Sequence, residues 1–370
     1  MRVLHNVFVG ALVLVATSAL ASTTCSSVYD SLASNIASNA TPPAGYSSWL
    51  AHDSAKYPQC FSASTAAAQA QMSGTSLQQV GVTSSVISAR LNGGPAGGAS
   101  KSASLPQSGM AAGSTPEKWN AWVSAAQNDT RQNYTQGTNA ISSSTDIRNV
   151  VIGGDYMVTS AVAWGASLAI DSGDNSGTTN GGAALTSDSQ GYSLAPYVGW
   201  QINQDWTLDA SAGLGRGKLT ATNSETKSRR LFVGGNLIFN RWAGDWQYTG
   251  KLGLMHAEEK SDDIRNAGAA IANTATTNKM NRLQAGAQIG YWTSGGAMPY
   301  AAVTLLSDSR STTNNGGASD PIGKTAAQWA LGVNFFSLNS GVTGGVSYMA
   351  ESSRSNQKNN ALMGNLNFRF

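Results

Sequence analysis

Four acidic side chains gather near residue 260 of this 370-residue chain and could hold a cation. Glu258 and Glu259 are followed closely by Asp262 and Asp263. Carboxylate oxygens are the ligands that hard divalent cations prefer, but a calcium loop spaces its ligands in a regular pattern that these four lack. A solvated loop end is the alternative interpretation, and the spacing favours it.

Patterns typical of catalysis are incomplete. The histidines are His5, His52 and His256, which are too scattered to predict a metal site. The GAS triplet at residues 165–167 lacks the closing glycine of a nucleophile elbow. The GLGRG stretch at 213–217 resembles a nucleotide-binding loop, but it lies within an alternating strand pattern. The sequence therefore predicts neither an enzyme nor a bound cofactor or metal.

The N-terminus predicts export and a disulfide. Residues 1–21 have the parts of a secretory signal peptide: Arg2, the apolar run Val7–Val15 and the small-residue cleavage site Ala19-Leu20-Ala21. The chain has two cysteines, Cys25 and Cys60. Export into an oxidising compartment predicts that they form a disulfide, with two unpaired thiols as the alternative.

Composition excludes several classes of protein. Charged residues make up 12% of the chain, the net charge is +3, and no basic cluster occurs, so nucleic-acid binding is not expected. Apart from the signal peptide, no stretch approaches the eighteen apolar residues of a membrane-spanning helix. A mean hydropathy of −0.19 is nevertheless compatible with membrane strands, because alternation dilutes their hydropathy.

From Trp119 onward, apolar residues recur at every second position, which is a strand pattern. Leu208, for example, lies between Thr207 and Asp209, and the alternation continues to Leu214. Twelve such segments occur, near residues 119–131, 146–158, 161–173, 191–203, 206–221, 227–241, 245–260, 279–293, 298–311, 325–338, 341–355 and 358–370.

The connections alternate between tight turns and longer loops, which we place at 132–145, 174–190, 261–278 and 312–324. An even number of strands with this alternation is typical of an outer-membrane barrel. A soluble β-sandwich explains the alternation equally well. Two observations favour the barrel: the small polar residues suit a wet lumen, and aromatic residues flank the short turns as in a membrane girdle. The predicted girdle comprises Trp200, Trp206, Trp242, Trp246, Tyr291 and Tyr300.

We therefore predict an all-β fold, a 12-stranded antiparallel transmembrane β-barrel with a short α-helical N-terminal region. Helices are expected at Val28–Ile36, Tyr46–Tyr57 and Ser76–Leu91. A barrel of twelve strands leaves a lumen about 12 Å wide, which is the width of one helix. We expect the last of the three helices to occupy it, through the apolar residues Leu77, Val80, Ile87 and Leu91.

Inward charged residues are expected to line the lumen. They could contact the helix, or they could merely hydrate the wall. The predicted lumen residues are Asp155, Asp171, Asp209, Lys251 and Arg369.

These features together resemble a classical (type V) autotransporter. The octapeptide KWNAWVSA at 118–125 is similar to the Trp-rich first strand of that family, and residues 148–170 resemble its next hairpin. The closing GNLNFRF resembles its terminal assembly signal, which would comprise Gly364, Leu366, Phe368 and Phe370. We expect the last three of these to face lipid, and this strand to pair with the first strand near Trp119.

The resemblance covers residues 76–370 and implies a domain order. A signal peptide (1–21) precedes a short disulfide-containing, passenger-like segment (22–75), a linker helix with a flexible linker (76–118) and the barrel (119–370). The passenger-like segment is far shorter than the β-helical passengers of the family and lacks their repeats.

The resemblance also implies location, partners and function. We expect a monomer in the lipid of a Gram-negative outer membrane, assembled by periplasmic chaperones and the β-barrel assembly machinery. The barrel would help to export or display its own N-terminal segment. The alternative is a binding, anchoring or channel barrel whose N-terminal segment stays in the periplasm.

Overall fold

The fold is taken from a computed structural model, which describes most of the chain from residue 118 onward and a few positions before it. The described residues are 31, 32, 34, 35, 38, 40–45, 48, 49, 52, 53, 81, 83, 84, 86, 87, 118–136, 139–179, 185–221, 224–266, 269, 270, 275–313, 322–337 and 342–370. The predicted signal peptide lies outside them, as do Cys25 and Cys60, so the disulfide stays a prediction.

The described residues form twelve long strands and one short hairpin, whose two strands have two residues each. The long strands are β1 (Trp119–Gln136), β2 (Asn139–Met157), β3 (Val162–Thr179), β4 (Leu185–Gln201), β5 (Trp206–Ala221), β6 (Ser224–Ala243), β7 (Trp246–Ser261), β10 (Thr276–Tyr291), β11 (Ala297–Thr312), β12 (Thr325–Ser337), β13 (Val342–Ser352) and β14 (Gln357–Arg369). The short hairpin consists of β8 (Arg265–Asn266) and β9 (Ala269–Ala270), between β7 and β10.

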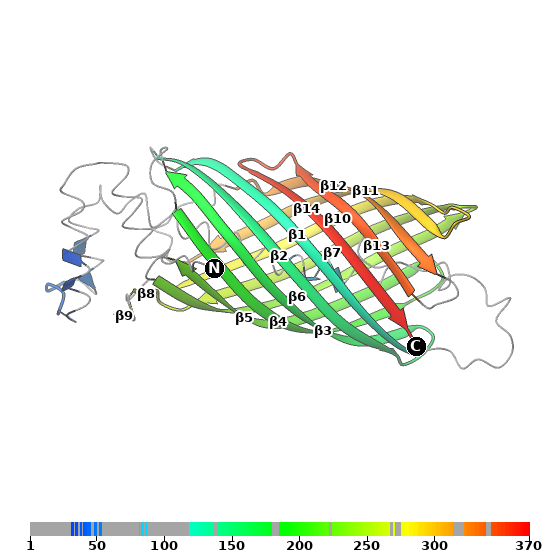
Figure 1. Cartoon of the computed structure of the whole chain (residues 1–370), viewed down its shortest axis with the longest axis horizontal. Coiled ribbons are helices and arrows are strands. Elements are labelled where there is room, and N and C mark those ends of the chain that lie inside the picture. Colours follow the sequence, from blue (N-terminus) through cyan, green and yellow to red (C-terminus); the bar gives the residue numbers. More distant parts are fainter. Residues whose placement is uncertain are drawn as a thin grey trace.

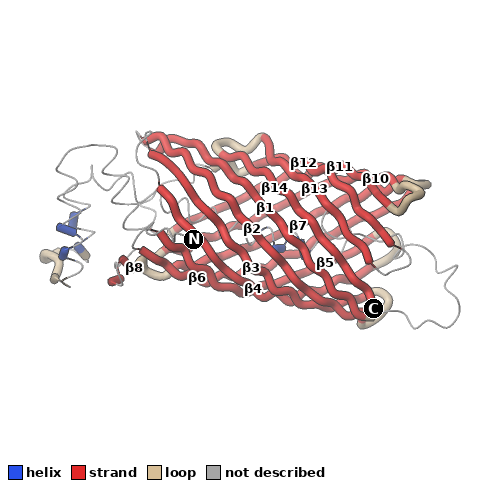
Figure 2. Tube along the Cα trace, viewed as in Figure 1, coloured by secondary structure: helices blue, strands red, loops and turns tan. Residues whose placement is uncertain are grey.

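Every long strand pairs antiparallel with its sequence neighbour, and β14 pairs with β1 to close the barrel. Figures 1 and 2 show the strands tilted steeply around a cylinder, as closure of a sheet requires. At the closing seam, Trp119 N donates to Phe370 O at 3.1 Å, and Phe370 N donates to Trp119 O at 3.0 Å. The predicted closed 12-stranded barrel is confirmed, and the pairing leaves no exposed sheet edge.

The strands extend further toward the long-loop side than the sequence suggested. Residues 132–136 and 139–145 were expected in a loop, yet they continue the β1–β2 ladder, with Tyr134 opposite Ile141. In the same way β3 continues to Thr179, and β4 begins at Leu185. Serine, threonine and asparagine occupy both faces in these extensions, so the alternation that marks a strand is lost there although the backbone pairing continues.

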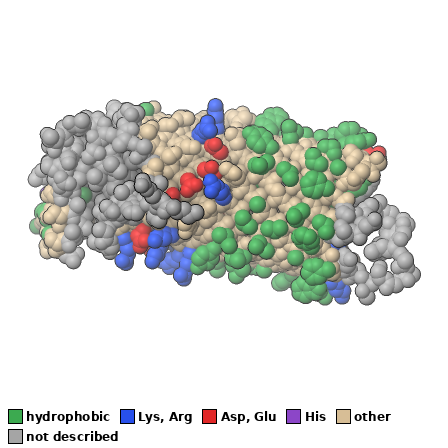
Figure 3. Space-filling view, in the orientation of Figure 1, with side chains coloured by type: hydrophobic (Ala, Val, Ile, Leu, Met, Phe, Trp, Pro, Cys, Tyr) green, Lys and Arg blue, Asp and Glu red, His purple; other side chains and the backbone are tan. Residues whose placement is uncertain are grey.

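The outer face is apolar only over the half of the barrel next to the short turns. On β5 the outward residues from Trp206 to Leu214 are apolar and exposed, and at the last strand so are Leu362, Leu366, Phe368 and Phe370. Nine residues at about 3.3 Å each, tilted about 40°, give a belt of roughly 23 Å, close to the apolar band of an outer-membrane barrel. Figure 3 shows apolar side chains gathered at the end that carries the C-terminus, and charged side chains at the belt's margin.

The aromatic residues near the short turns divide between the two faces. Most of the predicted girdle is on the outer face, where Trp206 stacks near Phe239 and Trp246 near Tyr291. Trp200 is exposed on the outer face. Trp242 is half-buried and lies opposite the buried Gln247, so it is on the inner side of the rim and not in the outer girdle as predicted. Tyr300 also points inward and is buried, so its assignment to the girdle was wrong. It has the same parity on β11 as Met298, whereas the outward residues, such as Leu305, have the opposite parity.

Each of the three predicted helices has described residues that are helical, and Ser48 is the described position among them that forms a bend instead. No helix in the described part of the chain is long and apolar enough to cross a bilayer. The helical positions are Ser31, Leu32, Ser34 and Asn35, then Trp49, His52 and Asp53, and finally Gly81, Thr83, Ser84, Val86 and Ile87.

Candidate functional site

The inner face of the barrel is polar, and it is the candidate functional surface. Its side chains are mostly small hydroxyls and amides carried at every second position of each strand. Such residues keep a lumen hydrated and open rather than filling it with an apolar core. Buried examples are Ser124, Asn128, Asn149, Ser167, Ser193, Asn236, Asn334, Asn365 and Asn367.

Inward aromatic rings lie across glycines of the neighbouring strand. Tyr197 on β4 is opposite Gly165 on β3, where an added Cβ would lie within 2.2–2.4 Å of two ring carbons and the hydroxyl oxygen of Tyr197. The missing side chain lets the ring lie flat against the wall and leaves the centre of the lumen open. The same arrangement pairs Trp122 with Gly153, Phe232 with Gly213, and Tyr300 with Gly332.

Tyr197 belongs to a buried polar chain across the first four strands. Trp122 Nε1 donates to Tyr197 Oη at 2.8 Å, and Tyr197 Oη donates to Asp155 Oδ2 at 3.1 Å. Asn120 Nδ2 also donates to Asp155, at 3.1 Å from Oδ1. Asp155 was predicted to face the lumen, and the structure places it there, 3% exposed.

Arg230 links three strands within the lumen. Its Nη1 lies 2.9 Å from both carboxylate oxygens of Asp171 on β3, and its Nε lies 3.4 Å from Glu259 on β7. All three side chains are buried. The guanidinium reaches β3 from β6 because glycines on the two intervening strands, Gly191 and Gly217, leave its path clear.

A second charged cluster surrounds Asp308 on β11. Arg282 contacts this carboxylate through Nε at 2.7 Å, Arg310 at 2.8 Å and Arg354 at 2.9 Å. Arg354 also donates to Glu351 at 2.7 Å. Asp308 and Arg354 have fully buried side chains, so these charges depend on one another for solvation.

A third polar group joins β5, β6 and β10 on the inner face. Asn236 Nδ2 donates to Asp209 at 2.8 Å, and Gln284 Nε2 donates to Asn236 Oδ1 at 2.8 Å. The amides pass over Gly253, where an added Cβ would lie 2.2 Å from Asn236 Oδ1. Lys251, half-buried on the same inner face, is attracted to Asp209.

The helical residues around position 85 pack against the inner face of the wall. Val86 is 1% exposed and Ile87 is fully buried. The two belong to one apolar cluster whose other members are inward residues of the barrel: Trp122, Val151, Ala169, Ala195, Tyr197, Phe232, Met255, Ala257 and Met280.

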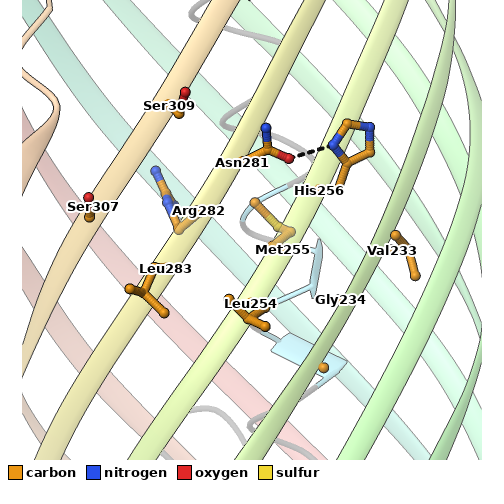
Figure 4. Close-up of a pocket in the computed structure, with 11 residues that line it drawn as sticks. Val233, Gly234, Leu254, Met255, His256, Asn281, Arg282, Leu283, Ser307 and Ser309 are labelled. Atoms are coloured by element: carbon orange, nitrogen blue, oxygen red, sulfur yellow. Dashed lines mark hydrogen bonds between the residues drawn. The ribbon is translucent and has the colours of Figure 1, made fainter.

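Two further close approaches place this helix against β6 and β10. A Cβ added at Gly234 would lie 3.2 Å from Ser84 Oγ, and one added at Gly81 would lie 3.5 Å from Arg282 Nη1. Figure 4 shows this stretch of wall from the side that carries Leu254 and Leu283, with the light-blue helical residues behind Gly234. Of the other predicted helix residues, Leu77, Val80 and Leu91 lie outside the described part.

The hollow drawn in Figure 4 is lined by residues from both faces of the wall. Outward residues such as Leu254 and Leu283 form its rim, and Met255 and Arg282 form its floor. At this rim, His256 Nδ1 donates to Asn281 Oδ1 at 2.7 Å. The histidine is thus accounted for by a cross-strand hydrogen bond.

The architecture and this lumen agree with one known family. The sequence matches the family described as Autotransporter beta-domain over residues 121–349. The chain belongs to the autotransporter family. Barrel domains of autotransporters reside in the Gram-negative outer membrane, and the predicted resemblance is thereby confirmed.

Solved autotransporter barrels have the same fold at low sequence identity. The translocator domain of NalP from Neisseria meningitidis is 15% identical, with a TM-score of 0.55, and the match covers 79% of this chain and 98% of that one. The β-domain of the Bordetella autotransporter BrkA is also 15% identical, with a TM-score of 0.51 and coverage of 68% and 100%. A comparison with curated proteins gives no match.

The terminal residues of this autotransporter barrel lie on the last strand as follows. Leu366, Phe368 and Phe370 are exposed on the outer face, at 44%, 43% and 65%. Gly364 is half-buried opposite Ala125 of β1. Arg369, expected in the lumen, is exposed at the rim because its strand ends there.

The acidic residues near 260 do not converge. Glu258 points outward and pairs with Lys260 at 2.9 Å and Lys279 at 3.2 Å, whereas Glu259 points inward to Arg230. Successive strand residues face opposite sides, so neighbours in sequence cannot share a ligand here. The positions that carry the lumen networks, such as Gly191 and Gly217, gave no functional signal in the sequence, because their role depends on the strand register.

Proposed function

We propose that this autotransporter barrel helps to export or display its own short N-terminal segment, residues 22–75, and that the helix of residues 76–91 remains in the lumen. One observation carries the proposal: Val86 and Ile87 are buried against inward barrel residues on β1 to β4, β6, β7 and β10. This helix precedes β1 in the sequence and lies among the inward residues of the barrel. It therefore connects the barrel to the N-terminal segment.

The wall has the dimensions for one helix. A lumen about 12 Å wide accepts a single helix about 10–12 Å across. The flat aromatic rings over glycines keep that width free, and Gly234 lets the helix approach β6 at Ser84. The contact between the helix and the barrel wall is apolar around Ile87 and polar near Gly81. A helix with both kinds of residue suits a lumen that contains water.

The proposed orientation places the short turns in the periplasm and the long loops outside the cell, as in bacterial barrels. Phe370 would then lie at the periplasmic rim, where the assembly machinery could recognise the last strand. Because β1 and β14 close the sheet, the barrel needs no second copy to cover an edge, and we propose a monomer.

Protease treatment of intact cells tests the proposal. An epitope tag placed after residue 22 should be removed by added protease, while the barrel stays intact. Protection of the tag until the outer membrane is permeabilised would reject export and favour a barrel whose N-terminal segment stays in the periplasm. Deletion of residues 76–91 should raise single-channel conductance, and unchanged conductance would reject the helix as a plug.

A further inference from the structure

Cations directly oppose one another on the outer face of β5, β6 and β7. Arg216 pairs in register with Arg229, and Lys218 with Lys227. On its other side Arg229 is opposite Lys260. Directly opposed residues have Cβ atoms about 4.5–5.5 Å apart, and like charges at that spacing are destabilising. We call these five residues the basic patch.

The basic patch begins where the apolar belt ends. Leu214 and Leu231 form the last apolar outward pair of β5 and β6, and they are 69% and 42% exposed. Two residues further along each strand, the outward positions are Arg216 and Arg229. With the belt in the bilayer core, the patch lies at the level of the lipid head groups on the long-loop side.

Nearby carboxylates neutralise the patch only in part. Glu225 contacts Lys218 at 2.5 Å, Asp262 contacts Arg229 at 3.6 Å, and Glu258 contacts Lys260 while also serving Lys279. Five cations thus outnumber three carboxylates by two. The Arg229 side chain remains 75% exposed and that of Lys260 61% exposed, so both are accessible to an anion from the membrane.

The charged margin on β1 to β4 differs from the patch in its balance of charge, although Arg131 lies opposite Lys358 of β14. On β1 to β4 the described outward residues beyond the belt carry more acids than bases, and the bases pair with them at 3.3–3.8 Å. On β11 the corresponding positions are serines. The bases on β1 to β4 are Arg131 and Arg148, and the acids are Asp129, Asp146, Asp174 and Asp188.

We infer that the basic patch binds the phosphate groups of a membrane lipid in the leaflet on the long-loop side. Phosphate oxygens accept bonds from several cations at once, and arginine matches their geometry. A phosphate bound between the opposed cations would be attracted to both of them and would offset their mutual repulsion. The inference requires the barrel to be embedded in a membrane, but it does not depend on export of the N-terminal segment.

Native mass spectrometry of the full-length chain in an uncharged detergent tests the inference. Phosphatidic acid, which carries a phosphate monoester, is titrated against phosphatidylcholine, and bound lipids are counted. A patch variant carries Arg216→Gln, Lys218→Gln, Lys227→Gln and Arg229→Gln. We expect the wild type to bind phosphatidic acid at least tenfold more tightly than the patch variant does, with phosphatidylcholine unaffected.

A matched control variant removes the same number of exposed cations elsewhere, through Arg131→Gln, Arg148→Gln, Arg241→Gln and Lys358→Gln. It should bind phosphatidic acid within twofold of the wild type. Equal loss in the two variants, or no loss in the patch variant, would overturn the inference. Equally tight binding of inorganic phosphate would also overturn it, because the site would then take a free anion. The single change Lys227→Glu, which creates a complementary pair with Lys218, should weaken lipid binding without impairing folding.

Discussion

Replacing Ile87 with alanine should release the helix from the barrel wall. The side chain is fully buried in the cluster that includes Phe232 and Met255. The substitution removes three carbons, worth about 0.8 kcal/mol each in transfer free energy. The cavity adds to this, so that buried Ile→Ala changes cost roughly 2–5 kcal/mol. A loss of about 3 kcal/mol shifts the balance between docked and released helix roughly 100-fold toward release.

Planar-bilayer recording of the full-length chain measures this shift directly. If the docked helix blocks the lumen, the fraction of time spent in the open, conducting state should rise by about two orders of magnitude in Ile87→Ala, within the limit of full opening. Leu214→Ala is the matched control, because that leucine is 69% exposed on the lipid-facing side. Its open fraction should equal that of the wild type.

The reasoning would be refuted by a correctly folded Ile87→Ala variant whose open fraction is unchanged. Folding is verified by the faster migration of the unheated barrel on a denaturing gel. An increase of the same size in Leu214→Ala would also refute it, because the effect would then come from the bilayer rather than from the lumen.

Three further predictions concern the wall. Gly165→Leu should displace the Tyr197 ring and break its hydrogen bonds, costing about 2–4 kcal/mol and lowering the temperature at which the barrel unfolds on a gel; an unchanged temperature would contradict the close packing. Asp171→Asn should cost about 3–5 kcal/mol in a denaturant titration, because it weakens a buried ion pair, and a change below 1 kcal/mol would show that the pair contributes little. Phe370→Ser should reduce the amount of barrel in the outer membrane far more than Trp200→Ser does, as measured by membrane fractionation; equal reductions would make the terminal residue an ordinary girdle aromatic.

The sequence predicted best where one face of a strand meets lipid. The strand Trp206–Ala221 has the bounds that its alternation indicated, because apolar and polar residues take turns over its first nine positions. The sequence predicted poorly where both faces of a strand meet water. Residues 139–145 were assigned to a loop there, although they pair with β1. Tyr300 was assigned to the outer face because it lies near a turn. Its parity on the strand, which places it on the inner face, is the better guide.

By itself the sequence determined the strand number, the antiparallel order, the lipid-facing residues and the family, because period-two patterning and turn residues are local properties. Only the tertiary structure decided which inward residues meet. Arg230 reaches Asp171 across two strands and 59 residues because two glycines happen to lie in its path. The opposed cations of the basic patch likewise arise from the register between β5, β6 and β7. Register is set by pairing along the whole strand, so no single stretch of sequence encodes these contacts.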